Sequence, residues 1–401
     1  MSTTPQTQSR ILLVATQSGT LYTFVLPLAN FLTELGHDVT LACSGDPQPD
    51  VPSYHETIED AGFEVVRLDL ARHIDPRRDR SAVRQLRALI RDLEVDVVHT
   101  YNSKAGVVGR LAAWREHVPC IVHTNLGLPF FKASLFSPLQ SLTYLTVELL
   151  VAKITDRILC ISKAEFDKAV RFRIARPPRL VDVGFGARFD VFDPAREDID
   201  MHTGEVARLR RLTDGGFVVG CVARLVREKG VDCLIEATAE AAAQLHQPLH
   251  VVVVGDGPER AALERQVSEM GTRAQVHFAG AIAEPRVVAA MYRLFDIFVL
   301  PTRWESFGVV FAEAMAMEIP VVGPDMEPIR TVIGQGPTGV LVTPDDPGEY
   351  AAAIVRLVRD PELRRRTGLA GADRSREHWD ERNVHARVYH AYRDVLDSLK
   401  G

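Results

Sequence analysis

Short apolar runs rich in β-branched residues alternate with amphipathic stretches along most of the chain. Each run has the length of a buried strand, and the stretches between them have the period of helices with one apolar face. Strands that alternate with helices in this way are typical of βα units around a parallel sheet. The pattern therefore predicts an α/β fold with parallel strands.

The predicted strands fall into two groups. In the first half of the chain they begin at Ile11, Asp38, Phe63, Val95, Cys120, Asp156 and Arg179. In the second half they begin at Phe217, Leu249, Ala274, Asp296, Pro320 and Gly339. The polar segment 184–205 between them has no periodic pattern, so we expect two domains, 1–200 and 201–401. A helical pattern from about Asp373 to Leu399 predicts a last helix (380–400) that packs back toward the N-terminal domain.

Length, charge and cysteine content agree with this picture. A chain of 401 residues exceeds the size at which one core stops growing. Its net charge of −6 argues against general binding of nucleic acid. The five cysteines stand singly, so we expect buried thiols rather than disulfides or a metal site. The polar N-terminal segment and the absence of a long apolar run indicate a cytoplasmic protein.

One region departs from the acidic average. Seven arginines lie between Arg72 and Arg91, against Asp75 and Asp79 only. A solvated helix face explains such a cluster, and an anionic partner such as lipid headgroups is the alternative. The apolar residues of PFFKASLFSPLQSLTYLTVELL suit core packing or a lipid-linked acceptor. Peripheral contact with the inner face of the membrane therefore stays open.

The strongest local feature is PTRWESFGVVFAEAMAMEIPVV, which follows a predicted strand. Glu305 precedes a helix expected to begin near residue 309, and Glu313 lies about one turn inside it. The loop carboxylate suits sugar hydroxyls, the amides at the helix start suit a phosphate, and the deeper carboxylate suits ribose hydroxyls. The turn into the helix consists of Ser306, Phe307 and Gly308.

Two cations flank another strand end. Arg224 and Lys229 follow the strand that begins at Phe217, where they could neutralise a diphosphate leaving group. The turn 255–257 follows the next strand but lacks the third glycine of a dinucleotide fingerprint, so a structural turn is the favoured interpretation. The D-x-D pattern at Asp198 lies in the acidic linker, and we interpret it as chance.

As a set, these segments resemble the retaining glycosyltransferases of family 4, which have the GT-B fold of two facing Rossmann-like domains. The resemblance covers nearly the whole chain and includes, in order, TQSGT, VHTYNSKAGVVGRLAA, VHTNLGLPFF, DRILCIS, ARLVREKG, VVGDGPE, FAG and the E-x7-E segment. The N-terminal blocks are most similar to the capsular and exopolysaccharide type, which adds sugars to lipid-linked or glycan acceptors.

The resemblance implies a donor that is a nucleotide-diphosphate sugar, with a UDP-sugar favoured, and a reaction that retains anomeric configuration without a metal. Glu313 would hold the ribose, Arg224 and Lys229 the diphosphate, and Glu305 the transferred sugar. The implied donor site also includes Gly19, Gly280, Ala281, Ser306, Phe307 and Gly308. The leaving phosphate would take the proton of the acceptor, which is a glycan, a lipid-linked glycan or a small natural product.

Residues on the acceptor side are less sharply indicated. Tyr101, Asn102 and Lys104 follow a strand and either line the acceptor site or begin a helix. His123, at the end of a strand, is either a core histidine or a catalytic contact. Many family members have histidines where this chain has Tyr101 and Leu126, which makes Leu126 a further acceptor-side candidate.

Two rival functions remain at this point. A sugar-nucleotide epimerase has the same type of fold, because fold alone does not determine a reaction. The second rival is a glycosyltransferase-like protein that has no activity and acts as the partner of a true enzyme. Leu126 is its best support, because the loss of a histidine near the reaction centre can accompany the loss of activity. The residues leave the nucleotide base, the transferred sugar and the acceptor open.

Overall fold

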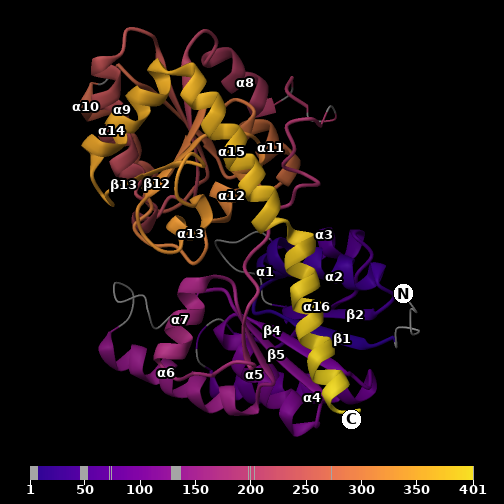
Figure 1. Cartoon of the computed structure of the whole chain (residues 1–401). Helices are drawn as coiled ribbons and strands as arrows, with labels where there is room; N and C mark the ends of the chain where they lie inside the picture. Colours follow the sequence, from indigo (N-terminus) through magenta and orange to yellow (C-terminus); the bar gives the residue numbers. More distant parts are fainter. Residues whose placement is uncertain are drawn as a thin grey trace. The chain divides into compact units, whose positions relative to one another are not determined.

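The chain folds into two compact units, each built around one parallel sheet (Figure 1). The structure, a computed structural model, describes residues 8–45, 53–71, 73, 75–127, 137–196, 198, 200–202, 204–271 and 273–400. Unit 1 consists of Met1–Gly184 and Val384–Gly401, and unit 2 of Phe185–Asn383.

The division between the units lies at residue 184, ahead of the boundary that we expected near residue 200. The polar segment after Gly184 makes its contacts within unit 2. Ala187 forms a β-bridge with Asp380, and an Nη atom of Arg293 donates a hydrogen bond of 3.1 Å to the carbonyl oxygen of Pro194. The segment after Gly184 therefore belongs to unit 2. We had expected it to connect two domains because it has no periodic pattern.

In unit 1 the described residues form a seven-stranded parallel sheet in the order β3-β2-β1-β4-β5-β6-β7. These strands confirm the strands predicted in this half from the apolar runs. The runs are continuous because a parallel sheet that is covered on both faces buries both sides of each strand. The strands are β1 (Arg10–Val14), β2 (Asp38–Ser44), β3 (Val65–Leu68), β4 (Val97–Tyr101), β5 (Cys120–Asn125), β6 (Arg157–Cys160) and β7 (Leu180–Asp182).

Helices cover both faces of this sheet (Figure 1). Leu13 of β1 shares a core with α2 (Leu26–Glu34) and α16 (Glu381–Ser398), whereas its neighbour Leu12 shares a core with α4 (Pro76–Asp92) and α5 (Ser103–Arg115). Successive strand residues point to opposite faces, so these two helix pairs lie on opposite sides. The other helical segments described in unit 1 are α1 (Ser18–Thr20), η1 (Leu21–Val25), α3 (His55–Asp60), α6 (Pro138–Val151), η3 (Ala152–Ile154) and α7 (Lys163–Arg171).

Unit 2 contains, among its described residues, a six-stranded parallel sheet in the order β10-β9-β8-β11-β12-β13. The strands are β8 (Phe217–Val222), β9 (Leu249–Val254), β10 (Gln275–Gly280), β11 (Ile297–Val299), β12 (Val321–Pro324) and β13 (Val340–Val342). The helical segments are α8 (Gly204–Leu212), η4 (Arg227–Lys229), α9 (Val231–Gln244), α10 (Arg260–Met270), α11 (Pro285–Tyr292), α12 (Val309–Ala316), α13 (Ile329–Ile333), α14 (Pro347–Arg359) and α15 (Pro361–Trp379).

The C-terminal helical pattern is interrupted, which the sequence did not indicate. Asp380 has an extended backbone between α15 and α16, and it forms the bridge with Ala187. The amide of Ala187 donates to the carbonyl of Trp379, and its carbonyl accepts from the amide of Glu381. Strand-like pairing at this point replaces the helical hydrogen bonds, so the chain leaves unit 2 here and α16 packs in unit 1 through Val388 and Tyr392.

The described part of the chain contains no helix with the length and hydropathy needed to cross a membrane. Over the same residues no three His, Cys, Asp or Glu side chains gather as metal ligands. All five cysteines are buried free thiols, as their placement in apolar runs predicted.

Candidate active site

The carboxyl ends of four neighbouring strands carry most of the predicted donor residues. The order β10-β9-β8-β11 places these strands side by side in unit 2. Gly280 ends β10, the turn at Gly255 follows β9, Arg224 follows β8 and Glu305 follows β11. Because the strands are parallel, these positions lie along one edge of the sheet, where α/β proteins commonly bind ligands.

The turn from β11 into α12 requires its glycine. Helix α12 begins at Val309, as predicted, and Gly308 precedes it with a left-handed backbone, φ 94°. A Cβ atom at this position would lie 2.6 Å from Cδ1 of the buried Ile329. Phe307 is buried, and its ring contacts that of Trp379 with 5.0 Å between centroids. The turn before α12 is therefore fixed to the core of unit 2.

Glu305 and Lys229 form an ion pair that joins two strand-end loops. Lys229 Nζ donates to Glu305 Oε1, and the amide of Ser306 donates to Oε2 at 3.3 Å. Their side chains are only 21% and 11% exposed. Gly230 follows Lys229 with φ 66° and lies so close to the carbonyl of Pro301 that a Cβ atom would collide with it. The structure thus brings together one predicted cation and one predicted carboxylate.

Glu313 lies on α12 in an environment that holds its proton strongly. Burial of the carboxyl group raises the pKa of Glu313 to about 7, although the hydrogen bond from Tyr292 and the charge of Arg188 both act to lower it. Tyr292 Oη donates to Glu313 Oε2 at 3.0 Å, and Tyr292 itself is fully buried. A titratable group perturbed by burial in this way is a common sign of a functional site.

Arg224 is exposed, and within the described residues its side chain has no hydrogen-bond or ion-pair partner. The loop that carries it packs on the turn after β9, where the amide of Leu225 donates to the carbonyl of Asp256 at 2.9 Å. The amide of Gly255 donates to the carbonyl of Gly280 at 2.8 Å, and Ala281 beyond it is exposed. The glycine turn therefore supports its neighbours, which is the structural role that we predicted.

Unit 1 places His123 in the core rather than at a surface. The side chain is fully buried, with Nδ1 2.8 Å from the Thr100 hydroxyl and Nε2 3.0 Å from Asn125 Oδ1. Burial, followed by the charge of Arg110, lowers the pKa of His123 to about 4. A neutral, enclosed imidazole with both nitrogens occupied cannot contact a substrate in this structure. These contacts favour the core interpretation of His123 over the catalytic one.

The other acceptor-side candidates are largely held by contacts within unit 1. Tyr101 is buried at the end of β4, and Lys104 Nζ pairs with Asp79 at 2.5 Å. Asn102 precedes α5 and accepts a 3.4 Å hydrogen bond from the amide of Thr16. Leu126 is partly buried and packs on the core shared by α2 and α16. These contacts fit residues that begin a helix and pack in unit 1 better than residues that line an acceptor site.

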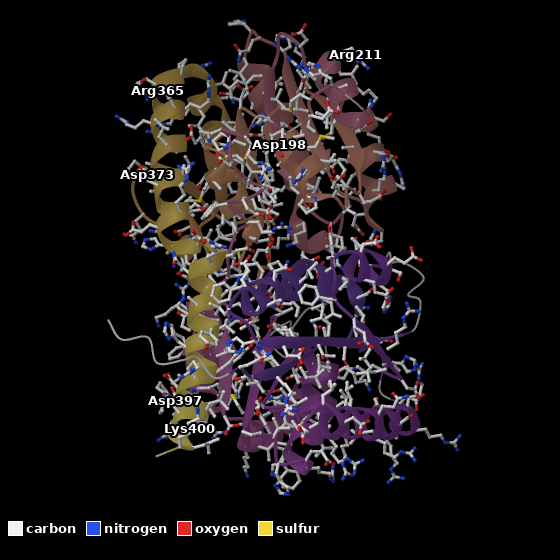
Figure 2. The ribbon with its side chains drawn as sticks, turned by 90° about the vertical axis from the view of Figure 1, so that its right-hand side faces the viewer. Asp198, Arg211, Arg365, Asp373, Asp397 and Lys400 are labelled. Atoms are coloured by element: carbon white, nitrogen blue, oxygen red, sulfur yellow. The ribbon has the colours of Figure 1, made fainter. Side chains whose placement is uncertain are left out.

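Gly19 lies in unit 1, within the short helical turn α1 that follows β1, and is partly exposed. The D-x-D aspartate of the linker is engaged as well: Asp198, labelled in Figure 2, accepts a hydrogen bond of 2.7 Å from Arg196 Nε. That bond is the largest cause that lowers the pKa of Asp198 to about 2. A salt-bridged linker residue agrees with the interpretation of this pattern as chance.

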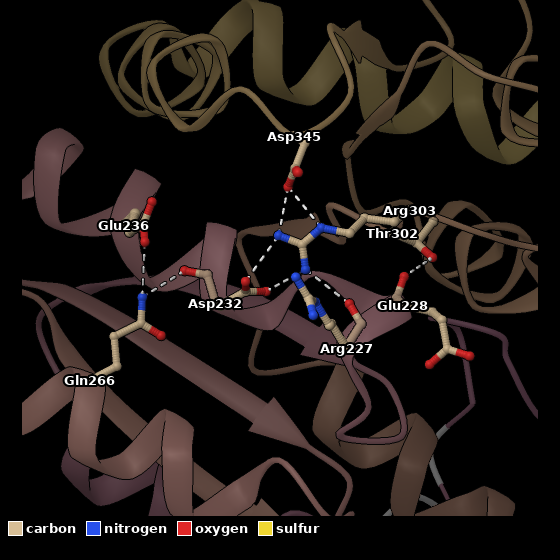
Figure 3. Close-up of polar contacts among 8 residues, drawn as sticks. All are labelled: Arg227, Glu228, Asp232, Glu236, Gln266, Thr302, Arg303 and Asp345. Carbon is tan, nitrogen blue, oxygen red and sulfur yellow. Dashed lines mark hydrogen bonds and ion pairs between the residues drawn. The ribbon is translucent and has the colours of Figure 1, made fainter. Parts of the chain in front are cut away.

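Sequence reasoning missed two residues of the site. Tyr292 contacts Glu313 from the end of α11. Arg303, two positions before Glu305 in the chain, binds the carboxylates of Asp232 and Asp345 (Figure 3). Nothing in the local pattern pairs Tyr292 with a glutamate on another helix. Arg303 lies in the segment that contains Glu305 and Glu313. Its positive charge two positions before Glu305 is the sequence feature that could have identified it.

Comparisons with known proteins identify relatives of this chain. A family model described as "Glycosyl transferases group 1" matches residues 209–374, and one described as "Glycosyl transferase 4-like domain" matches residues 19–186. The D-inositol 3-phosphate glycosyltransferase of Thermomonospora curvata is 32% identical over 70% of this chain and 67% of its own length. The capsular polysaccharide biosynthesis glycosyltransferase CapM of Staphylococcus aureus is 24% identical over 85% of this chain and 90% of its own.

A solved structure has the same fold. Anabaena HepE, in a crystal structure with UDP and glucose, matches with a TM-score of 0.79 and 19% identity, over 96% of this chain and all of its own. This match shows the GT-B fold, and the two family models with the relative from Thermomonospora show that the chain belongs to the group 1 glycosyltransferases.

Proposed function

We propose that the chain is a retaining glycosyltransferase that moves a hexose from a nucleotide-diphosphate sugar to an acceptor hydroxyl. The observation that carries this proposal is the Lys229–Glu305 ion pair at the sheet edge, with the partly buried Glu313 in the helix that follows. Glu313 accepts hydrogen bonds from the ribose, Lys229 and Arg224 neutralise the diphosphate, and Glu305 contacts the transferred sugar.

In this proposal the bond between the anomeric carbon and the diphosphate oxygen breaks while the acceptor oxygen bonds to the same face of the sugar. The acceptor proton passes to the departing phosphate oxygen, so the products are a glycoside and a nucleoside diphosphate. Negative charge grows on the diphosphate as the bond breaks. Arg224 and Lys229 stabilise that charge, which is the main catalytic task of the protein. These two cations supply the positive charge without a metal.

A UDP-sugar is the donor that we favour. HepE, whose fold this chain shares, was crystallised with UDP and glucose. CapM is named for capsular polysaccharide biosynthesis, which supports the glycan or lipid-linked acceptor that we favour, whereas the name of the relative from Thermomonospora, D-inositol 3-phosphate glycosyltransferase, supports a small acceptor. A cytoplasmic location, where nucleotide sugars are available, is part of this proposal.

Two experiments test the proposal. Thermal-shift measurements with UDP-, GDP- and ADP-sugars identify the donor, because a ligand that binds the native state raises the melting temperature. A transfer assay with that donor then compares the wild type with Glu313→Ala and Arg224→Ala, and NMR gives the anomeric configuration of the product. We expect both variants to lose activity and the product to retain configuration. Wild-type rates in both variants, or an inverted product, would contradict the proposal.

The acceptor side of the proposal includes peripheral contact of unit 1 with an anionic membrane. Helix α6 exposes Leu139 and Leu142 at 74% and 59%, and Glu148 is its one buried residue. Helix α5 packs on α6 and on α4, which carries the exposed cations Arg77 and Arg80. Exposed leucines on α6, one helix away from the arginine-rich α4, suit a bilayer with anionic headgroups.

Sedimentation with lipid vesicles tests this contact. Vesicles that contain phosphatidylglycerol should carry the wild type down, and those of phosphatidylcholine alone should not. Leu139→Ser combined with Leu142→Ser should abolish binding, whereas Leu399→Ser, which alters another exposed leucine of unit 1, should leave it unchanged. Equal recovery of wild type and double variant with the anionic vesicles would reject the contact.

A further inference from the structure

Arg303 joins three segments at the strand ends of unit 2 (Figure 3). Its two Nη atoms each donate to Asp232 at 2.9 Å, while Nε and Nη2 donate to Asp345 Oδ1 at 2.8 and 2.6 Å. Nη1 also donates to the carbonyl of Arg227 at 2.9 Å. Asp232 lies in the first turn of α9, and Asp345 lies in the turn after β13. One guanidinium group therefore connects the ends of β8, β11 and β13.

The same segment is tied to the Lys229 loop through the backbone. The amide of Arg303 donates to the carbonyl of Glu228 at 2.7 Å, and the Thr302 hydroxyl donates to the same oxygen at 3.1 Å. Glu228 directly precedes Lys229 in the chain, and Arg303 lies two residues before Glu305. These contacts fix the two loops to each other next to the ion pair between Lys229 and Glu305.

The exposure of these ion pairs indicates that they position the loops more than they stabilise the folded protein. The side chains of Asp232 and Asp345 are 43% and 53% exposed, and that of Arg303 is 27% exposed. Ion pairs this accessible to water contribute little to the free energy of unfolding. The hydrogen bond to Asp232, then the one to Asp345, raise the pKa of Arg303. Without the guanidinium, two carboxylates would stand unneutralised beside the place proposed for a diphosphate.

We propose that Arg303 is a positioning residue of the donor site. It holds Lys229 and Glu305 in register and neutralises Asp232 and Asp345 next to the diphosphate. This inference rests on the proposed function, because the residues that it positions are those that bind the donor. Lysine at this position keeps the positive charge but lacks the planar fork that binds Asp232 through two hydrogen bonds. Arg303→Lys therefore separates position from charge.

A double-mutant cycle tests the inference. The measurement is kcat/KM for transfer with the donor identified above, in wild type, Arg303→Lys, Lys229→Ala and the double variant. We expect Arg303→Lys to lower kcat/KM by about tenfold in the wild type, since small misplacement of a catalytic group is costly. In the Lys229→Ala background the same change should cost less than about twofold, because Lys229 is absent and its ion pair, through which Glu305 is held, is already lost. Affinity for UDP, measured by calorimetry, extends the cycle to variants with little turnover.

The control is Arg365→Lys, which alters an exposed arginine of unit 2 that pairs with Glu362 far along the chain on α15. It should leave kcat/KM and UDP affinity unchanged. An equal loss from Arg303→Lys in both backgrounds would show a structural role and overturn the inference, as would no loss at all while Lys229→Ala is impaired. Full activity of Lys229→Ala would instead count against the proposed function.

Discussion

Tyr292 Oη donates a hydrogen bond of 3.0 Å to Glu313 Oε2, which joins the end of α11 to the middle of α12. Tyr292 has no exposed surface, and burial raises the pKa of Glu313 to about 7. The carboxyl group that we assign to the donor ribose is thus half-ionised near neutral pH. Donor binding that needs the carboxylate should therefore depend on pH in the physiological range.

Replacing Tyr292 tests this dependence. The hydrogen bond from Tyr292 favours the carboxylate, so Tyr292→Phe should raise the pKa of Glu313 above about 7. Because a protonated carboxyl accepts fewer hydrogen bonds, donor affinity should rise with pH in both proteins, with a higher midpoint in the variant. Calorimetric titration of UDP across the pH range measures both midpoints. Identical midpoints would argue that Glu313 is not the group that controls binding.

Glu313→Gln gives a prediction for stability. An unfolded chain ionises Glu near 4.5 and the folded protein at about 7, so the folded state retains a proton in this window that the unfolded state has lost. Raising the pH through the window destabilises the wild type, and the penalty is complete above about 7. The glutamine variant escapes it, so its stability relative to wild type should increase by roughly 3 to 4 kcal/mol between acid and alkaline pH.

Thermal unfolding of both proteins at a series of pH values checks this result. Glu381 also has a pKa raised to about 7, chiefly by burial, but it is present in both proteins and its effect cancels in the difference. A difference in stability that is the same at every pH would contradict the environment described for Glu313.

The buried ion pair of unit 1 should behave as a structural element. Arg110 is fully buried and donates to both carboxylate oxygens of Glu148, at 2.9 and 2.8 Å. Arg110→Met leaves Glu148 buried without its partner and should cost about 3 to 5 kcal/mol. Adding Glu148→Leu should recover most of that loss. Denaturant unfolding measures both variants, and Lys163→Ala, which breaks an exposed pair with Asp167, serves as the control near zero.

Gly308 and Gly336 form a matched pair for the turn before α12. Both have a left-handed backbone, with φ of 94° and 93°, but a Cβ at Gly308 would meet Ile329 at 2.6 Å whereas one at Gly336 would meet nothing within 4 Å. Gly336→Ala should cost about 1 kcal/mol from backbone strain alone. Gly308→Ala should cost more and should also lower transfer activity. Equal losses from the two substitutions would show that the contact with Ile329 is unimportant.

The strands and the E-x7-E turn could be predicted because they depend on local pattern. A continuous apolar run has few alternatives to a buried strand, and Gly308 before Val309 marks the start of α12 through backbone geometry. The proximity of Lys229 and Glu305 could also be predicted, because both follow strands whose carboxyl ends lie at one edge of the sheet.

What escaped prediction depends on contacts between distant segments. Asp380 interrupts the last helix because it pairs with Ala187, and that pairing leaves no signal in a helical pattern. The sequence left His123 open between a core and a catalytic role, because its hydrogen bonds to Thr100 and Asn125 are visible only in the fold. The boundary at residue 184 was missed because an aperiodic segment can pack on a domain as well as connect two.

The most direct test of the account is calorimetric titration of UDP into the wild type, Glu313→Ala and Lys229→Ala. The account predicts binding to the wild type and affinity at least about tenfold weaker in each variant, since each loses a hydrogen bond or charge on one ligand. Variants that bind UDP as tightly as the wild type would show that Glu313 and Lys229 do not share a nucleotide ligand.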